Sequence, residues 1–208
     1  MSAHANSKPR TLTRFKKVAL FTVLLLAATE SLCTYNTLHY QGEDVKTAWA
    51  QVLVEYQRRA DLIPGLANLV KSYTTHETAA LTQVANARAD LGSIRIEEVK
   101  PGDRQIIARY EAAQTQMRWA LSRLIAVAEN YPELRADLAF RDLQAQLEGT
   151  ENRIAYARQR YIETVQAHNL TVRTFPSNLL ATLLEQAAIP NFTVANEKAV
   201  AISPKVND

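Results

Sequence analysis

Apolar residues recur along most of this chain with the three- and four-residue spacing of amphipathic α-helices. The first such stretch covers residues 43–63, and its apolar face consists of Val45, Ala48, Trp49, Val52, Tyr56, Ala60 and Ile63. A second stretch covers residues 66–91. Pro64 lies between them, and we expect it to kink or break the helix because proline lacks an N–H and clashes with the preceding turn. Residues 92–102 contain two glycines and a proline and predict a connecting loop.

The two most regular helical patterns follow this loop. The first begins after Asp103, a predicted N-cap, and its heptad seam consists of Ile107, Tyr110, Gln114, Met117, Leu121, Leu124 and Ala128. Tyr131-Pro132 ends it. The second runs from Glu133 to about Thr174, is expected to continue through Gly149, and has a stripe of Leu143, Leu147, Thr150, Ile154, Ala157, Tyr161, Val165, His168 and Val172. With a shorter helix from Pro176 to Ala188, these patterns predict an all-α fold, an antiparallel bundle of three to four long helices.

The N-terminal sequence has the pattern of a targeting segment. Residues 1–17 contain five basic side chains and no acidic one, and residues 18–29 are apolar or small until Glu30 interrupts them. This order is typical of a secretory signal or signal anchor, although a full span needs about 20 apolar residues. If Glu30 is neutralised or its carboxylate snorkels to the membrane surface, residues 32–38 lengthen the apolar segment until it is just long enough to cross a membrane. The basic leader should stay inside, because Lys and Arg resist translocation.

These observations predict four regions and a location. We expect a cytoplasmic leader over residues 1–17, a retained signal anchor or transmembrane helix over 18–38, a helical bundle over 39–188 and a flexible tail over 189–208. The bundle would lie on the outer, periplasmic side of the bacterial cytoplasmic membrane as a single-pass protein. The alternative is cleavage with lipid attachment at Cys33, the only cysteine, although Leu32 stands where a lipoprotein signal wants a small residue.

The charge distribution excludes a nucleic-acid surface. The whole chain carries a net charge of +3, but the leader alone carries +5, which leaves −2 for residues 18–208. Nucleic-acid binding needs Lys and Arg clustered on the folded domain.

Several strings of residues resemble the LemA family of bacterial envelope proteins. The strings are Tyr35-Asn36-Thr37, Trp49, residues 57–64 (QRRADLIP), His76-Glu77, Ala87-Arg88-Ala89, residues 128–134 (AENYPEL), Leu143-Gln144, residues 147–158 (LEGTENRIAYAR), Tyr161, Asn169 and Phe175-Pro176. The resemblance covers roughly residues 34–185. The resemblance implies an N-terminal membrane segment followed by long antiparallel helices, and no established enzymatic activity. It also implies a loose connection to membrane organisation, because relatives take part in magnetosome membrane formation.

No motif for a cofactor, a metal or catalysis is evident. The residues three before His39, His76 and His168 are not acidic, so the inward-facing Glu-x-x-His pairs of a di-iron bundle are missing. Five scattered glycines make neither a phosphate-binding loop nor a dinucleotide fingerprint. We therefore expect no cofactor, no metal and no small-molecule substrate.

One polar cluster is a candidate site. It comprises Arg58, Arg59 and Asp61 on the first bundle helix and Glu148, Glu151, Asn152 and Arg153 on the last, with Arg158 nearby. Two interpretations stay open: an ion-pair network that fixes the register of the helices, or a groove that binds a partner. The aromatic–proline pairs Tyr131-Pro132 and Phe175-Pro176 mark helix ends, or form a docking patch if both lie at one end of the bundle.

The predicted function is a non-enzymatic, membrane-anchored scaffold or interaction protein, binding envelope proteins or further copies of itself. The alternative is a helical enzyme or protease-accessory protein with its site at the polar cluster.

Overall fold

The computed structural model describes residues 10–74, 76–95 and 99–191, and this part of the chain is helical throughout, with no strand. The helices are α1 (Arg10–Tyr73), α2 (Thr78–Gly92), α3 (Arg104–Val127), α4 (Pro132–Ala136), α5 (Leu138–Arg173) and α6 (Ser177–Leu183), with a 3-10 turn at Ala128–Asn130. The predicted all-α class is therefore confirmed.

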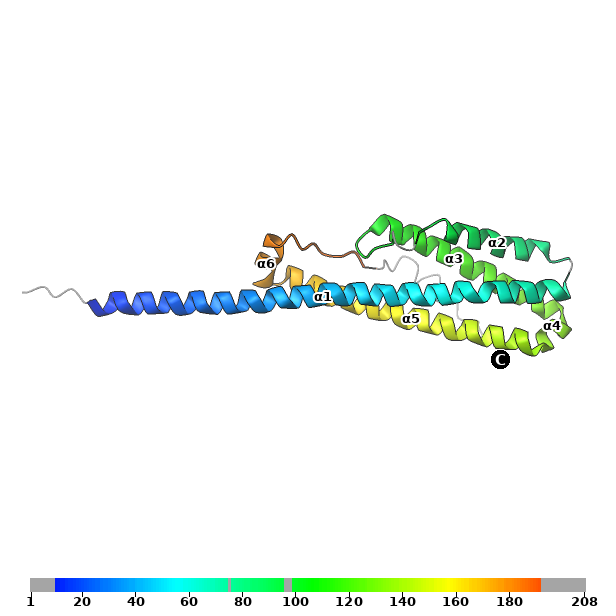
Figure 1. Cartoon of the computed structure of the whole chain (residues 1–208), viewed down its shortest axis with the longest axis horizontal. Helices are drawn as coiled ribbons and strands as arrows, with labels where there is room; N and C mark the ends of the chain where they lie inside the picture. Colours follow the sequence, from blue (N-terminus) through cyan, green and yellow to red (C-terminus); the bar gives the residue numbers. More distant parts are fainter. Residues whose placement is uncertain (1–9, 75, 96–98, 192–208) are drawn as a thin grey trace, which may run out of the picture.

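The four long helices run alternately up and down (Figure 1). Helix α5 lies antiparallel along α1, and the hairpin of α2 and α3 packs beside this pair. The predicted stripes form most of the core: all seven seam positions of the α3 region are buried, as are seven of the nine predicted positions on α5. The other two, Leu143 and Val172, are half-buried. Heptad spacing produces this result because it keeps one apolar seam facing the neighbouring helix along its whole length.

Helix α1 continues through Pro64, so the predicted break at this residue is wrong. An interior proline costs about 3 kcal/mol or more. However, Ile63, Leu66 and Val70 around it are at most 1% exposed and pack against α2, α3 and α5. Each such burial contributes about 1.5–3 kcal/mol, so tertiary packing outweighs the local cost of the proline.

Asp137 divides the helix that the sequence predicts from Glu133 to Thr174. Its backbone is extended, and its carboxylate accepts hydrogen bonds from the N–H groups of Ala139 (2.7 Å) and Phe140 (3.3 Å), which begins α5. The Tyr73 hydroxyl donates to the other carboxylate oxygen at 2.6 Å. Beyond this point α5 is continuous across Gly149, as predicted. Asp103 is confirmed as the N-cap of α3, because it accepts from Gln105 and Ile106.

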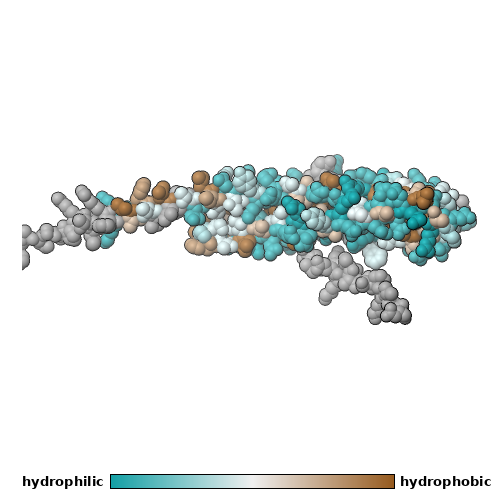
Figure 2. Space-filling view, turned by 90° about the horizontal axis from the view of Figure 1, so that it is seen from below, coloured by the Kyte–Doolittle hydropathy of each residue, from teal (hydrophilic) through white to brown (hydrophobic). Residues whose placement is uncertain are grey.

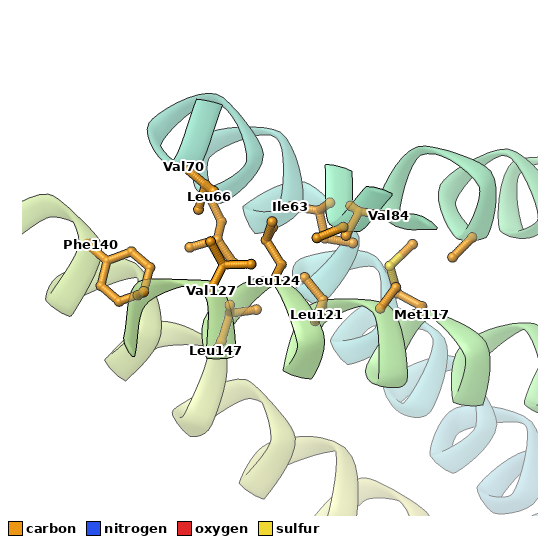
Figure 3. Packing of buried hydrophobic residues seen from close by; sticks show 14 of the residues in the cluster. Ile63, Leu66, Val70, Val84, Met117, Leu121, Leu124, Val127, Phe140 and Leu147 are labelled. Carbon is orange, nitrogen blue, oxygen red and sulfur yellow. The ribbon is translucent and has the colours of Figure 1, made fainter. Parts of the chain in front are cut away.

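The core forms two apolar clusters along the bundle axis. One lies at the end of α1 near Tyr73 and includes Ile63, Leu66, Val84, Leu124 and Phe140 (Figure 3). The other lies at the opposite end and includes Val45, Trp49, Tyr110, Ile154 and Tyr161.

The N-terminal part of α1 projects beyond the bundle (Figures 1 and 2). Every side chain that the structure describes between Lys16 and Cys33 is exposed, and Leu38 is the first buried one. Among the described residues, no helix combines the length and the apolar content needed to cross a membrane. Residues 1–9 of the predicted leader and 192–208 of the predicted tail lie outside the described residues.

Candidate functional site

A buried polar layer separates the two apolar clusters at the middle of the bundle. Arg59 of α1 is 2% exposed, and its Nη1 donates to the Glu151 carboxylate of α5 at 2.5 Å. Its Nη2 donates to the side-chain oxygen of Gln114 on α3, and to the carbonyl of the same residue at 3.4 Å. One guanidinium therefore links the three longest bundle helices.

Aromatic rings surround this layer on the side of the second cluster. The Arg59 guanidinium lies 5.4 Å from the centroid of the Tyr56 ring, and the rings of Tyr56 and Tyr110 meet edge to face at 5.7 Å. Burial raises the pKa of both tyrosines, so both stay neutral. Because the aromatic faces carry partial negative charge, they stabilise the buried guanidinium without a second carboxylate.

The other members of the predicted cluster lie apart from this layer. Arg58 points outward and its Nη1 is 3.7 Å from the Glu55 carboxylate. Asp61 accepts a hydrogen bond from Gln57, and Glu148 accepts one from Gln144, each within its own helix. Arg158 lies elsewhere, 3.2 Å from Glu111 of α3. The seven residues thus do not form one site.

Arg58 and Arg153 instead line a shallow depression at the surface where α1 meets α5. One cavity, of about 520 Å³, is bordered by Arg58, Leu62, Gly149 and Arg153. A second cavity, of about 590 Å³, begins on the other side of Arg153 and is lined by Glu55, Asn152, Arg153, Tyr156 and Arg160 among others. We call the two cavities together the α1–α5 groove.

The sequence interpretation missed Tyr156 in this groove and the role of Gln114 in the polar layer. Tyr156 is 70% exposed and lies between Arg153 and Arg160 on α5. The signal was present in the spacing, because residues 153, 156 and 160 share one face of a helix. Gln114 was placed on the core seam, but its role as a partner of Arg59 required the register between helices. Outside the groove, burial raises the pKa of Glu111.

The histidines are dispersed. His168 is buried, its imidazole is hydrogen-bonded to the backbone of Ala187, and burial lowers its pKa. His39 and His76 are exposed, and His4 lies outside the described residues. Within the described part of the chain, no three His, Cys, Asp or Glu side chains are placed to hold a metal ion together.

The two aromatic–proline pairs lie at opposite ends of the bundle. Tyr131 precedes α4 and Phe175 follows α5, and the 36 residues of α5 run between them. At a rise of about 1.5 Å per residue, they separate these ends by about 54 Å. The hypothesis of a docking patch shared by both pairs is therefore wrong.

Comparison with known proteins agrees with the resemblance drawn from the sequence. The model of the LemA family matches residues 48–207, which includes every residue of the polar layer and of the α1–α5 groove. The chain belongs to the LemA family. Two relatives of this LemA-family chain are the Magnetosome proteins MamQ 1 and MamQ 2 of Paramagnetospirillum magneticum. Each is 24% identical over 193 residues, which cover 83% of this chain and 71% of the relative.

Proposed function

We propose that this chain is a non-enzymatic scaffold of the bacterial cell envelope, held in the cytoplasmic membrane by α1 and docking a partner protein along the α1–α5 groove. The main support for this proposal is the composition of the α1–α5 groove. The groove presents Arg153 and Arg160 beside the exposed Tyr156, and Arg58 in the adjoining cavity.

The arrangement of α1 supports the anchor. The ammonium groups of Lys16 and Lys17 precede the apolar segment, and Tyr35 and Tyr40 follow it with exposed rings. From Lys17 to Tyr35 a helix rises about 27 Å, close to the roughly 30 Å of a bilayer's hydrocarbon core. Basic residues at the inner face and tyrosines at the outer face are the usual borders of a spanning helix. Glu30 falls inside this span and has to snorkel towards the outer surface.

The form of attachment is testable at Cys33, which is exposed and free of disulfide bonds. A retained α1 anchor predicts that Cys33→Ser stays in the membrane fraction after alkaline extraction. If the variant instead appears in the periplasm, attachment depends on a lipid at the cysteine.

The chemistry of the groove indicates the partner. Within the described part of the chain, Arg153 and Arg160 form no ion pair, and Arg58 has only the 3.7 Å contact with Glu55. Arginine and tyrosine contribute a large share of binding energy in protein interfaces, because both combine apolar area with directed hydrogen bonds. An acidic segment of an envelope protein fits these side chains. The rival, an enzyme or protease-accessory protein using the polar cluster, has less support because Glu151 and Gln114 already bind the Arg59 guanidinium inside the bundle.

Site-specific photo-crosslinking in the native bacterium tests the docking face. A benzoylphenylalanine at position 156 should form a protein adduct of defined mass, and Arg153→Glu should abolish it. The matched control is position 119, where Trp119 is similarly exposed (63%) on α3. Adducts from position 119 but not 156 would move the docking face to α2 and α3, and no adduct at either position would contradict the scaffold.

A further inference from the structure

Four large apolar side chains are exposed at the end of the bundle from which α1 projects. They are Leu170 (67% exposed), Phe175 (75%), Leu179 (64%) and Leu183 (78%), and we call them the apolar elbow. Residues 174–184, which contain three of them, include no charged side chain. Figure 2 shows apolar surface at this end of the bundle.

The elbow has one outward face. Helix α6 buries Ala181 against the rest of the bundle, where that residue is 1% exposed. Leu179 and Leu183 are four residues apart on α6, so they lie on one side of the helix, away from Ala181. Phe175 is exposed just before the helix begins. A cluster of exposed apolar side chains of this kind marks an interaction surface in a folded protein.

The antiparallel register places the elbow beside the membrane-proximal part of α1. His168 of α5 lines the same cavity as Leu38 and Gly42 of α1. From His168 to the end of α5 at Arg173 the helix advances about 7.5 Å towards the N-terminus of α1. Helix α6 then packs against both α1 and α5 (Figure 1). The elbow therefore reaches the level of α1 where exposed Tyr35 follows the apolar segment.

We propose that the apolar elbow is embedded in the outer interfacial region of the bilayer that α1 crosses, as a second membrane contact. This inference rests on the proposed α1 anchor. An uncharged apolar helix face at headgroup level inserts shallowly into the headgroup and acyl boundary. Two neighbouring contacts at this end of the bundle limit its tilt and set the direction in which the α1–α5 groove faces. A second copy of this chain is the competing occupant of the elbow.

Depth-dependent fluorescence quenching tests the elbow in the full-length chain. In a Cys33→Ser background, single cysteines Leu179→Cys, Leu183→Cys, Leu25→Cys and Leu138→Cys are labelled with an environment-sensitive dye. The proteins are reconstituted into phosphatidylcholine–phosphatidylglycerol vesicles that contain lipids with a nitroxide at a shallow or a deep position. Leu138 is the matched control, because it is as exposed as Leu183 (78%) and lies at the other end of α5.

At positions 179 and 183 we expect blue-shifted emission and quenching by the shallow nitroxide. At position 25 we expect quenching by the deep nitroxide. At position 138 we expect no blue shift and no quenching by either nitroxide. If 179 and 183 behave like 138 while 25 is quenched, the elbow proposal is overturned and the anchor stands. If 25 is not quenched, the anchor is wrong and the elbow proposal fails with it. A blue shift without quenching, accompanied by disulfide formation between unlabelled Leu183→Cys chains, would assign the elbow to a second copy instead.

Discussion

Removing Glu151 tests whether the buried polar layer holds the helices in register. In Glu151→Ala, the guanidinium of Arg59 remains buried and loses the carboxylate that accepts from its Nη1 at 2.5 Å. Gln114 is then its remaining hydrogen-bonded partner within the layer. Breaking a fully buried ion pair costs about 3–5 kcal/mol. The Glu151 side chain is 39% exposed, so water replaces part of the interaction.

The loss on removing Glu151 is therefore best compared with the loss of a hydrogen bond to a charged group, which contributes about 1.5–3 kcal/mol to stability. We expect Glu151→Ala to lower the free energy of unfolding by about 2 kcal/mol, within that range. For a chain of this size, that loss corresponds to a fall of about 4–8 °C in the melting midpoint.

The assay is thermal and urea denaturation of the full chain in detergent, followed by circular dichroism. Glu148→Ala is the matched control, because Glu148 lies three residues earlier on α5 and, among the described residues, accepts its hydrogen bond from Gln144 on its own helix. Surface changes of this kind stay within about 0.5 kcal/mol. Adding Arg59→Met to Glu151→Ala should recover stability, because no buried charge is then left without its carboxylate. Equal midpoints for Glu151→Ala and Glu148→Ala would refute the register role of the polar layer.

Three further predictions concern single side chains. Burial lowers the pKa of the His168 imidazole, so this imidazole binds a proton more readily in the unfolded chain than in the folded one. The free energy of unfolding should therefore fall as the pH drops below about 6.5. His168→Gln should flatten this part of the stability–pH curve, and the control His39→Gln, at an exposed histidine, should not. The Tyr73 hydrogen bond is the main reason why the pKa of the Asp137 carboxyl is low, so Tyr73→Phe should raise that pKa in an NMR titration, and an unchanged value would contradict the contact. No atom outside its own stretch of α5 lies within 4 Å of a Cβ added at Gly149, so Gly149→Ala should stabilise the bundle by about 1 kcal/mol in urea denaturation. Gly149 lines the first cavity, so the added methyl group should also reduce the crosslink at position 156. A stabilised protein with full crosslinking would place the partner away from that cavity.

The helices with regular spacing were predictable because their sequence and packing agree. On α3 the heptad seam is the buried face, and the capping residue Asp103 stands at its start. The short connections between patterns also favour antiparallel neighbours, and the structure has that arrangement.

The misassigned boundaries share one physical cause, which is competition between local and tertiary energies. Pro64 is a local helix breaker, but the packing of its neighbours keeps α1 continuous. Asp137 has the opposite effect: its carboxylate caps α5 and ends α4 within a stretch whose apolar spacing looked uninterrupted. The spacing of apolar residues alone shows neither the packing energy around Pro64 nor the capping by Asp137.

The sequence placed Arg59 and Glu151 in one predicted cluster, but it did not show which members of that cluster face the core and which face the surface. Arg58 and Arg59 are adjacent in sequence, yet consecutive helical residues point about 100° apart, so one faces the core and the other the surface. Only the register between α1, α3 and α5 shows that Arg59 meets Gln114 and Glu151. The same register separates these buried residues from the α1–α5 groove.

A rigidly anchored scaffold requires one uninterrupted helix that joins the membrane segment to the bundle. Pulsed electron–electron double resonance measures the distance between two spin labels on this helix. The labels are placed at Leu25→Cys and Val54→Cys in a Cys33→Ser background, and the protein is reconstituted in lipid nanodiscs. Both side chains are exposed on α1 and are 29 residues apart. A continuous helix predicts a narrow distribution near 44 Å, at about 1.5 Å per residue. A broad distribution, or one centred well below this distance, would show a hinge between the segments and contradict the rigid scaffold.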